Sequence, residues 1–187
     1  MIRIVDDFFD DPDSVVALSE EMDFSLRNPQ WPGVRTRDLK EHAPKVKDMF
    51  VEHICDHYPR LNPFELNLDF RCGFQKVNSF SKDQYDLKNR GWAHQDTNCK
   101  WAGIMFLNKN PEPDTGTVFY KGTQSISVRK ESLYYKMELY NGDPLHEEEY
   151  KNAHEKMHSE LEVDMIVEPV YNRMLIFNGS EHYHCAH

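Results

Sequence analysis

A change in hydrophobic spacing near residue 64 constrains the fold of this chain more than any other feature. Before it, apolar residues recur at helical spacing over 12–22 and again over 42–58, which predicts two helices. The stretch 27–37 between them contains two prolines and a glycine and is expected to be a loop. After residue 64 apolar and polar residues alternate as far as Lys76, which predicts a long strand with one buried face.

Short apolar segments bounded by turn residues make up most of the remaining chain. Strands are expected at 2–9, 92–96, 101–107, 116–120, 163–168, 173–177 and 182–184. The charged segment 144–162 has Tyr150, Ala153, Met157 and Leu161 at helical spacing, so it is predicted to be a surface helix inserted between strands.

This order of elements predicts the architecture. Short strands separated by turns are typical of a sandwich or barrel, and the N-terminal helices are expected to pack on one outer face of it. The chain of 187 residues fits one domain. Its expected parts are a helical portion over about 10–60, a β core over about 64–187 and the inserted helix over about 144–162.

Charge and composition exclude several classes of partner. The net charge of −10, from 22 Lys and Arg against 32 Asp and Glu, disfavours binding to a phosphate backbone, so no nucleic-acid partner is expected. No apolar run approaches 18 residues, and the N-terminus lacks the blocks of a secretory signal, so no membrane association is expected. The four cysteines form no CxxC pair and are expected to be free thiols in a cytoplasmic protein.

The segment Gly91-Trp-Ala-His94-Gln-Asp96 contains the most informative motif. Side chains at i and i+2 of an extended segment point to the same side, so His94 and Asp96 can approach one metal ion together. One imidazole and one carboxylate form a ligand set that suits Fe(II), Mn(II) or Zn(II). The pair alone would also suit an ordinary surface turn, and a catalytic site needs a third ligand.

A second cluster of histidines, about 90 residues later, offers that third ligand. It follows an apolar strand over 173–177 and contains His182, His184 and His187. Alternation places His182 and His184 on one side of a strand and His187 on the other, so both His182 and His184 remain candidates. A distant histidine at the end of a strand would complete a facial triad and leave adjacent metal positions open.

Taken together, these residues resemble a known enzyme group. His94-x-Asp96, the Gly116-Thr117-Val-Phe-Tyr strand, the Asn172-Arg-Met-Leu-Ile-Phe-Asn-Gly segment and Tyr183-His184-Cys-Ala look like the iron(II)/2-oxoglutarate dioxygenase superfamily. The resemblance is to its prolyl-4-hydroxylase-like branch and that branch's small phage and bacterial members. It covers roughly residues 64 to 187, and the opening Arg3-Ile-Val-Asp-Asp-Phe-Phe also looks like the start of those small members.

The resemblance implies a mainly β fold with flanking helices, a double-stranded β-helix (jelly roll, cupin-like). It also implies Fe(II) as the metal, 2-oxoglutarate and O₂ as co-substrates, and hydroxylation of a substrate with release of succinate and CO₂. His184 becomes the preferred third ligand because Tyr183-His184-Cys-Ala matches the ending of the family, with His182 as the alternative. The substrate is expected to be a small molecule or a protein side chain, neutral or cationic; neither its identity nor the oligomeric state is predicted.

One departure from the family pattern concerns 2-oxoglutarate. In the family, a basic residue about one strand beyond the distal histidine binds the far carboxylate. Here the sequence stops three residues after His184, so either the natural chain continues or another cation serves. Arg71, Lys76 and Arg173 are the candidates on predicted strands, although Arg173 could equally form a structural salt bridge.

The sequence is also compatible with two other functions and contains two other histidine pairs. The fold could be a cupin-like metalloprotein that does not use 2-oxoglutarate, or a jelly-roll binding module without catalysis. The i, i+4 pairs His53/His57 and His154/His158 lack the glutamate of an HExxH zinc site and lie in polar sequence, so they are predicted to face solvent.

Overall fold

The computed structural model describes residues 1–26, 33–58, 61, 70–79, 81–83, 86, 89–96, 98–140 and 146–186. Over these residues the chain forms two compact units, which are described separately. The first contains Met1–Asp7 and Ser79–His187, and the second contains Phe8–Asn28 and Gly33–Asn78. The prediction that the whole chain is one domain, with the N-terminal helices packed on one face of the sheets, stays a prediction.

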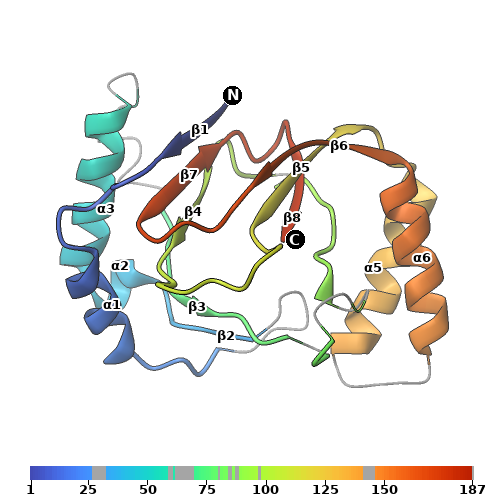
Figure 1. Cartoon of the computed structure of the whole chain (residues 1–187), viewed down its shortest axis with the longest axis horizontal. Helices are drawn as coiled ribbons and strands as arrows, with labels where there is room; N and C mark the ends of the chain where they lie inside the picture. The colour runs from blue at the N-terminus through green and yellow to red at the C-terminus, as the bar shows by residue number, and fades with distance from the viewer. Residues whose placement is uncertain are drawn as a thin grey trace. The chain divides into compact units, whose positions relative to one another are not determined.

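The first unit contains two antiparallel sheets of three strands each (Figure 1). In one sheet β7 (Arg173–Phe177) lies between β1 (Ile2–Val5) and β4 (Ala102–Phe106). In the other, β5 (Thr117–Gly122) lies between β6 (Leu161–Val167) and β8 (Tyr183–Ala186). The central strands β5 and β7 carry the longest buried runs, as expected of strands covered on both faces.

An apolar core joins the two sheets. Its buried members are Phe119, Val167, Leu175 and Phe177, and residues of β1 and β4 pack against them. The rings of Phe119 and Phe177 meet edge to face with centroids 5.0 Å apart, a favoured aromatic arrangement.

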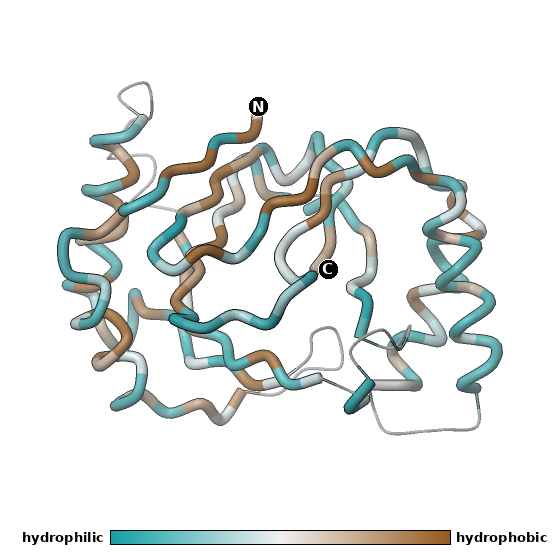
Figure 2. Tube along the Cα trace, in the orientation of Figure 1, coloured by the Kyte–Doolittle hydropathy of each residue, from teal (hydrophilic) through white to brown (hydrophobic). Residues whose placement is uncertain are grey.

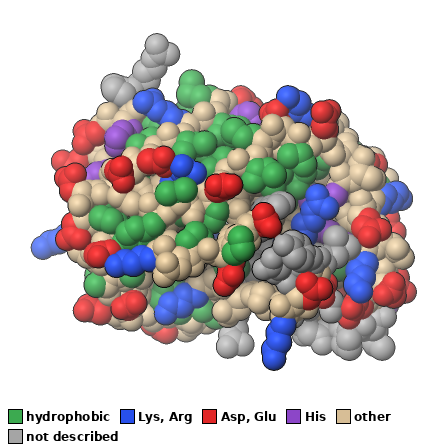
Figure 3. Space-filling model, viewed as in Figure 1, with side chains coloured by type: hydrophobic (Ala, Val, Ile, Leu, Met, Phe, Trp, Pro, Cys, Tyr) green, Lys and Arg blue, Asp and Glu red, His purple; other side chains and the backbone are tan. Residues whose placement is uncertain are grey.

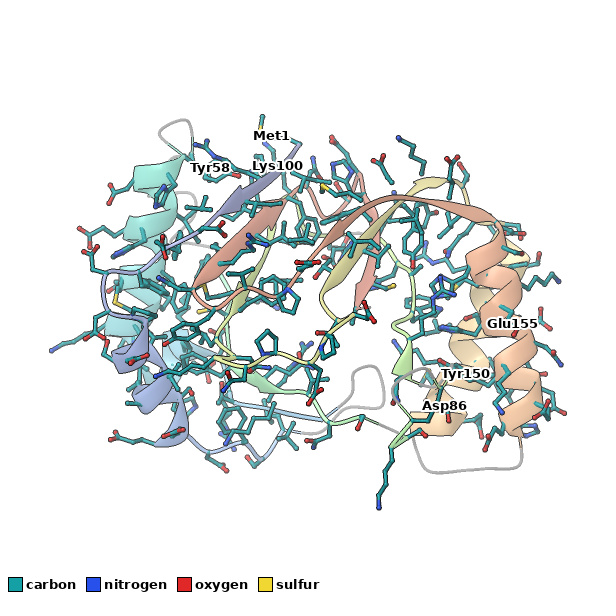
Figure 4. All side chains as sticks on the ribbon, viewed as in Figure 1. Met1, Tyr58, Asp86, Lys100, Tyr150 and Glu155 are labelled. Atoms are coloured by element: carbon teal, nitrogen blue, oxygen red, sulfur yellow. The ribbon has the colours of Figure 1, made fainter. Side chains whose placement is uncertain are left out.

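The opposite face of the β5 sheet is covered by two helices, α5 (Ile126–Tyr140) and α6 (Glu147–Ser159), which lie side by side in Figure 1. Because side chains alternate along β5, Val118 and Tyr120 point to this side and pack with Val128 of α5 and Met157 of α6. Most of α6 is hydrophilic (Figure 2), yet it is buried along one stripe. Tyr150 belongs to that stripe, whereas Glu155, also labelled in Figure 4, is exposed.

The second unit consists of three helices and a two-stranded ribbon. These are α1 (Pro12–Glu20), α2 (Leu39–His42), α3 (Pro44–His57) and the antiparallel pair β2 (Val34–Arg35) and β3 (Gln75–Lys76). Helix α1 begins as its sequence predicts, with Pro12 in the first turn and the Asp11 carboxylate accepting a hydrogen bond from the Ser14 N–H at 3.1 Å. The core of the second unit is aromatic, and the ring centroids of Phe9 and Phe50 lie 4.9 Å apart.

The surface of the first unit carries several exposed apolar side chains on its edge strands. Ile4 of β1 and Val163 and Ile166 of β6 are each at least two-fifths exposed. Figure 3 shows hydrophobic side chains gathered over these strands, with acidic and basic side chains interspersed around them. In the described part of the chain, no helix has the length and apolar character needed to span a bilayer.

Several sequence predictions are confirmed and others need correction. The antiparallel strands at 101–107, 116–120, 163–168 and 173–177 and the inserted helix are confirmed, with small shifts at their ends. A mainly β fold is wrong in proportion, because more of the described residues are helical than extended. One cause is the helix α5, which the sequence does not predict. A second is the segment 70–74, which forms no strand. Within the described part of the strand expected over 64–76, only Gln75–Lys76 is extended, and 64–69 lie outside the described residues.

Candidate metal centre

Backbone pairing brings the two histidines of the predicted triad together. His94 and His184 form an isolated antiparallel bridge, in which each N–H donates to the other's carbonyl, at 3.0 Å and 2.9 Å. Directly opposed residues of an antiparallel pair project their side chains to the same face. The two imidazoles therefore lie side by side, with ring centroids 4.5 Å apart.

Asp96 is held by a third stretch of backbone. Its N–H donates to the carbonyl of Gly179 at 2.9 Å, in the turn between β7 and β8. A methyl group built on Gly179 would lie 2.9 Å from both Cβ and Oδ2 of Asp96, closer than side chains approach in practice. The absence of a side chain at Gly179 is thus what leaves room for this carboxylate.

The hydrogen bonds of the two imidazoles determine which nitrogen faces the centre. His94 Nδ1 lies 2.8 Å from the Trp92 carbonyl, and His184 Nδ1 lies 3.0 Å from the His182 carbonyl. A carbonyl oxygen only accepts, so each Nδ1 carries the hydrogen and each Nε2 presents a lone pair. Metal-binding histidines in proteins typically donate their other ring N–H in this way.

Both Nε2 atoms face the carboxylate of Asp96. His94 Nε2 is 3.7 Å from Asp96 Oδ1, and His184 Nε2 is 3.6 Å from Asp96 Oδ2. One ligand atom from each of the three residues lies within 4.8 Å of the others. Adjacent ligands of an ion with bonds of about 2.1 Å are roughly 3 Å apart, so these residues fit a divalent metal after a small inward movement.

Burial keeps the imidazoles neutral. His184 is 6% exposed and packs edge to face on Phe177 at 4.6 Å. Its burial, followed by the nearby charge of His94, lowers its pKa to about 4, and burial likewise lowers the pKa of His94. Neutral imidazoles can bind a metal near pH 7 without first losing a proton.

The centre is open on one side. The side chains of His94 and Asp96 are each about one-third exposed, in contrast to that of His184. A bound ion would therefore retain positions that solvent or a small ligand could reach. Such open positions distinguish a catalytic metal site from a structural one.

Helix α5 supports the His94 segment through Trp92. The Trp92 indole N–H donates to Ser132 Oγ at 3.0 Å, and its ring stacks on the His94 imidazole at 5.5 Å with planes 11° apart. The Lys136 ammonium lies 4.9 Å from the centroid of the same ring. Neither Ser132 nor Lys136 was predicted from the sequence, because the helix that carries them was not.

The alternative ligand and the predicted co-substrate anchor lie elsewhere. His182 is not part of the three-residue group among the described residues, and its Nε2 lies 3.0 Å from the Met1 amino group. Arg173 donates to the Asp6 carboxylate at 2.9 Å and to the Glu168 carbonyl at 3.1 Å. Arg173 lies at one end of β7, and Phe177, which packs on His184, lies at the other end. The backbones of these two residues are separated by roughly 13 Å, the length of four strand residues.

Arg173 therefore forms the structural ion pair considered as its alternative role, and the structure does not bring it to the metal centre. Of the other anchor candidates, Arg71 and Lys76 belong to the second unit. Lys76 there places its ammonium 4.2 Å from the Phe24 ring centroid. His187, which the alternation of the sequence placed on the other side of the strand, lies outside the described residues.

The prediction that His154 and His158 face solvent is wrong. They are 0% and 6% exposed, with their Nε2 atoms 3.1 Å apart. His158 lies against the Gly91 carbonyl and the Tyr120 ring of β5, and His154 lies against the Tyr150 ring. Burial lowers their pKa values to about 3 and about 4. His53 and His57 are half-buried; the His57 ring stacks on Phe8, and the His53 ring lies tilted against it.

Comparison with known proteins gives a family but no function. No curated protein matches the chain, and a search of solved structures likewise finds no match. A family model described as a family of unknown function (DUF6445) matches residues 1–187. The chain therefore belongs to the DUF6445 family.

Proposed function

We propose that this chain is a non-haem iron(II) oxygenase that uses 2-oxoglutarate and O₂ to hydroxylate a substrate, with His94, Asp96 and His184 as the metal ligands. One observation carries the proposal: the Nε2 atoms of two imidazoles face one carboxylate at 3.7 Å and 3.6 Å, and no hydrogen bond joins the three groups. Such an arrangement is repulsive when empty, and a cation between the three groups turns the repulsion into attraction.

The ligand types and the opening favour a catalytic ion over a structural one. Two histidines and one carboxylate on one side of an ion form the facial triad of non-haem iron(II) oxygenases, with the remaining positions open. Four-ligand structural zinc sites have no such opening. An iron(II) ion held here would supply the activation of O₂.

The chain's own residues would fix the ion and exclude water from part of it. The carbonyls of Trp92 and His182 orient the two imidazoles, and the Gly179 carbonyl orients the Asp96 backbone. Phe177 and Phe119 pack against the His184 ring, so that ligand is shielded from solvent. Substrate would approach from the side on which His94 and Asp96 are exposed.

A jelly roll is the fold we propose for the sheets of the first unit. Two antiparallel sheets share an apolar core, and the ligands lie where β8 meets the His94 segment. These features support the family resemblance of the sequence, in which the metal is bound within a double-stranded β-helix.

Metal binding and its consequence can be tested in order. The purified protein is loaded anaerobically with iron(II), and the affinity is compared for wild type, His94→Ala, His184→Ala and His182→Ala. Loss of iron in the first two variants but not in His182→Ala is expected, because only the first two residues belong to the three-ligand group. If His184→Ala retains iron and His182→Ala loses it, His182 rather than His184 is the third ligand.

The second step concerns 2-oxoglutarate. Adding it anaerobically to the iron-loaded protein should produce the weak visible charge-transfer band of an iron-bound 2-oxo acid. Under O₂, succinate should then form, and formation should depend on iron. Fully loaded iron without the band and without succinate would refute the 2-oxoglutarate assignment while leaving the metal centre in place.

The position of Arg173 favours one alternative, a cupin-like metalloenzyme that does not use 2-oxoglutarate. Its guanidinium is bound by Asp6, so the strand cation expected to anchor the co-substrate is otherwise engaged. Oxidation or isomerisation of a substrate at the same rate with and without 2-oxoglutarate would establish this alternative. A chain that binds no metal and whose stability is unaffected by a chelator would instead be a binding module.

A further inference from the structure

The segment that carries His94 contains one residue more than the part of β8 with which it pairs. The Gly91 N–H donates to the Ala186 carbonyl at 2.9 Å, and three residues later His94 bridges to His184. Between these two points the segment has two residues, whereas β8 has one. An extra residue of this kind is a β-bulge, which interrupts the ladder of backbone hydrogen bonds. Pairing with β8 alone therefore does not determine how the segment presents His94.

Side chains from the helical side of the β5 sheet bind the carbonyl groups of this segment. The His158 imidazole of α6 lies with its Nε2 3.1 Å from the Gly91 carbonyl oxygen. Gln124, which precedes α5, donates its amide N–H to the Ala93 carbonyl at 3.3 Å. Both side chains belong to residues that are more than nine-tenths buried. The bulged segment is thus held by β8 on one side and by these two side chains on the other.

Gly91 shows how closely the segment is held. A methyl group built on Gly91 would lie 2.5 Å from both the backbone N and the O of Ala186 and 3.0 Å from the Cβ of Cys185. The backbone of Gly91 therefore lies directly against β8, while His158 binds its carbonyl from α6. A shift of Gly91 would change the register of the segment and would move the His94 ring three residues later.

The hydrogen positions on the histidine pair of α6 make His158 the donor. A carbonyl oxygen only accepts, so His158 Nε2 carries the hydrogen that binds Gly91. His154 Nε2, 3.1 Å from His158 Nε2, is then a lone pair, and the hydrogen of His154 is on Nδ1. Neither Nδ1 atom has a hydrogen-bond partner among the described residues. Buried polar groups without partners lower stability, so stability alone does not account for an imidazole at position 158, whereas the bond to Gly91 does.

We infer that His158 and Gln124 are positioning residues for the metal ligand His94: they hold the carbonyls of the bulged segment and thereby the place of the His94 imidazole beside His184. This inference rests on the proposed metal centre. Neither side chain belongs to the three-ligand group, so both act through the backbone of the segment. Removing groups that orient metal ligands typically costs 10- to 100-fold in affinity, and we expect the lower end of this range.

The test measures cobalt(II) affinity and the free energy of unfolding separately, with affinity measured under conditions in which each variant is fully folded. His158→Leu removes the donor, and His158→Gln retains an N–H at a similar distance from the backbone. His154→Leu is the matched control, because His154 is a buried histidine one turn earlier on α6 that lies against His158 and Tyr150. Both leucine variants are expected to change stability. Only His158→Leu should weaken cobalt(II) binding, by about tenfold, and His158→Gln should recover most of the affinity.

Gln124→Met tests the same inference independently of α6, and it decides the question if His158→Leu does not fold. It removes the amide N–H from a side chain of similar shape and should weaken cobalt(II) binding by about threefold to tenfold. The visible spectrum of the cobalt(II)-saturated protein gives a second measurement. In His158→Leu and Gln124→Met it should move toward the spectrum of His94→Ala, because the same ligand is displaced, whereas His154→Leu should keep the wild-type spectrum.

The possible failures can be told apart. If the wild type does not bind cobalt(II), the metal centre itself is wrong, and with it the proposed function. If His158→Leu and Gln124→Met bind cobalt(II) as tightly as the wild type and with its spectrum, the metal centre stands and the positioning role is refuted. An equal loss of affinity in His154→Leu and His158→Leu would also refute it, because the packing of α6 rather than the bond to Gly91 would then set the affinity.

Discussion

Replacing Gly179 with alanine is expected to weaken metal binding through Asp96 alone. The added methyl group would lie 2.9 Å from Asp96 Cβ and Oδ2 and 3.2 Å from Ala102 Cβ. Ordinary contacts begin near 3.4 Å, so the carboxylate has to move by about half an ångström or more. Gly179 is not among the residues with positive φ, so alanine can adopt its backbone conformation and the effect is steric.

The size of the effect follows from how precisely a metal ligand must be placed. Perturbing the groups that orient metal ligands typically costs 10- to 100-fold in affinity, and a 1 Å misplacement at a reacting centre costs about 100-fold. We therefore expect Gly179→Ala to raise the dissociation constant for iron(II) or cobalt(II) by about 10- to 100-fold. This corresponds to about 1.4–2.7 kcal/mol of binding free energy.

Calorimetric titration with cobalt(II), supported by competition with a chelator, measures the change. Gly103→Ala is the matched control, because a methyl group there meets the Cε atom of Met174 at 2.7 Å, and that flexible end can move aside. Its metal affinity should equal that of the wild type. A Gly179→Ala protein that binds cobalt(II) within twofold of the wild type, or a Gly103→Ala protein that loses as much affinity, would refute the reasoning.

Three further predictions concern parts of the first unit outside the ligand set. His154 and His158 are buried with pKa values of about 3 and about 4, so below pH about 6.5 the unfolded chain takes up protons that the folded chain does not. Urea titrations should therefore show the free energy of unfolding falling between pH 6 and 4 by about 1.4 kcal/mol per pH unit for each imidazole, and a flat profile would contradict this. Ser132→Ala leaves the Trp92 indole N–H without its acceptor and should lower the free energy of unfolding by about 1–3 kcal/mol in the same assay. An unchanged free energy would contradict this and would mean that water replaces the hydroxyl. Arg173→Gln should leave the affinity for 2-oxoglutarate within twofold of that of the wild type, because the Arg173 guanidinium is paired with Asp6 at the far end of β7. A larger loss of affinity would mean that Arg173 does bind the co-substrate.

The strands that the sequence predicts best are those whose apolar pattern has a single physical reading. Strand β7 has the predicted bounds 173–177, because a run of four apolar residues with turn residues on either side suits a strand buried on both faces. Strand β5 is predicted for a related reason, because β-branched and aromatic residues follow Gly116. In the structure its residues 117–120 are all buried. Turn residues and runs of apolar residues are local features, so they can be identified directly in a sequence.

Helix α5 could not be predicted because its burial contradicts its hydrophobicity. Its buried stripe consists of Val128, Ser132 and Lys136, whereas Ile126 and Tyr134 are more than half exposed. A pattern that places polar residues inside and apolar residues outside gives no amphipathic signal. The error at His154 and His158 is of the same kind, because polar residues of α6 face the interior, where His158 lies against Gly91 and Tyr120 of β5.

The choice of the third ligand shows where a motif stops being informative. Alternation made His182 and His184 equivalent, and the preference for His184 came from resemblance alone. In the structure, the register of β8 brings His184 beside His94: His184 lies opposite Phe119 of β5 and also bridges to His94, whereas His182 precedes the strand. Register depends on contacts between distant segments, so no reading of the local pattern could supply it.

The same local device orients both imidazoles, and it explains why the centre can be formed before a metal arrives. Each histidine directs its Nδ1–H to the carbonyl two residues earlier in the chain, Trp92 for His94 and His182 for His184. The backbone bridge between the two histidines then fixes both rings on one face. Because backbone carbonyls hold both imidazoles, a bound ion would need only a small inward movement of its ligands, and the cost of bringing three lone-pair donors together is met by folding. Metal affinity should thus depend more on the register of β8 and on the turn that carries Gly179 than on the loops around the opening, which are left to determine the substrate.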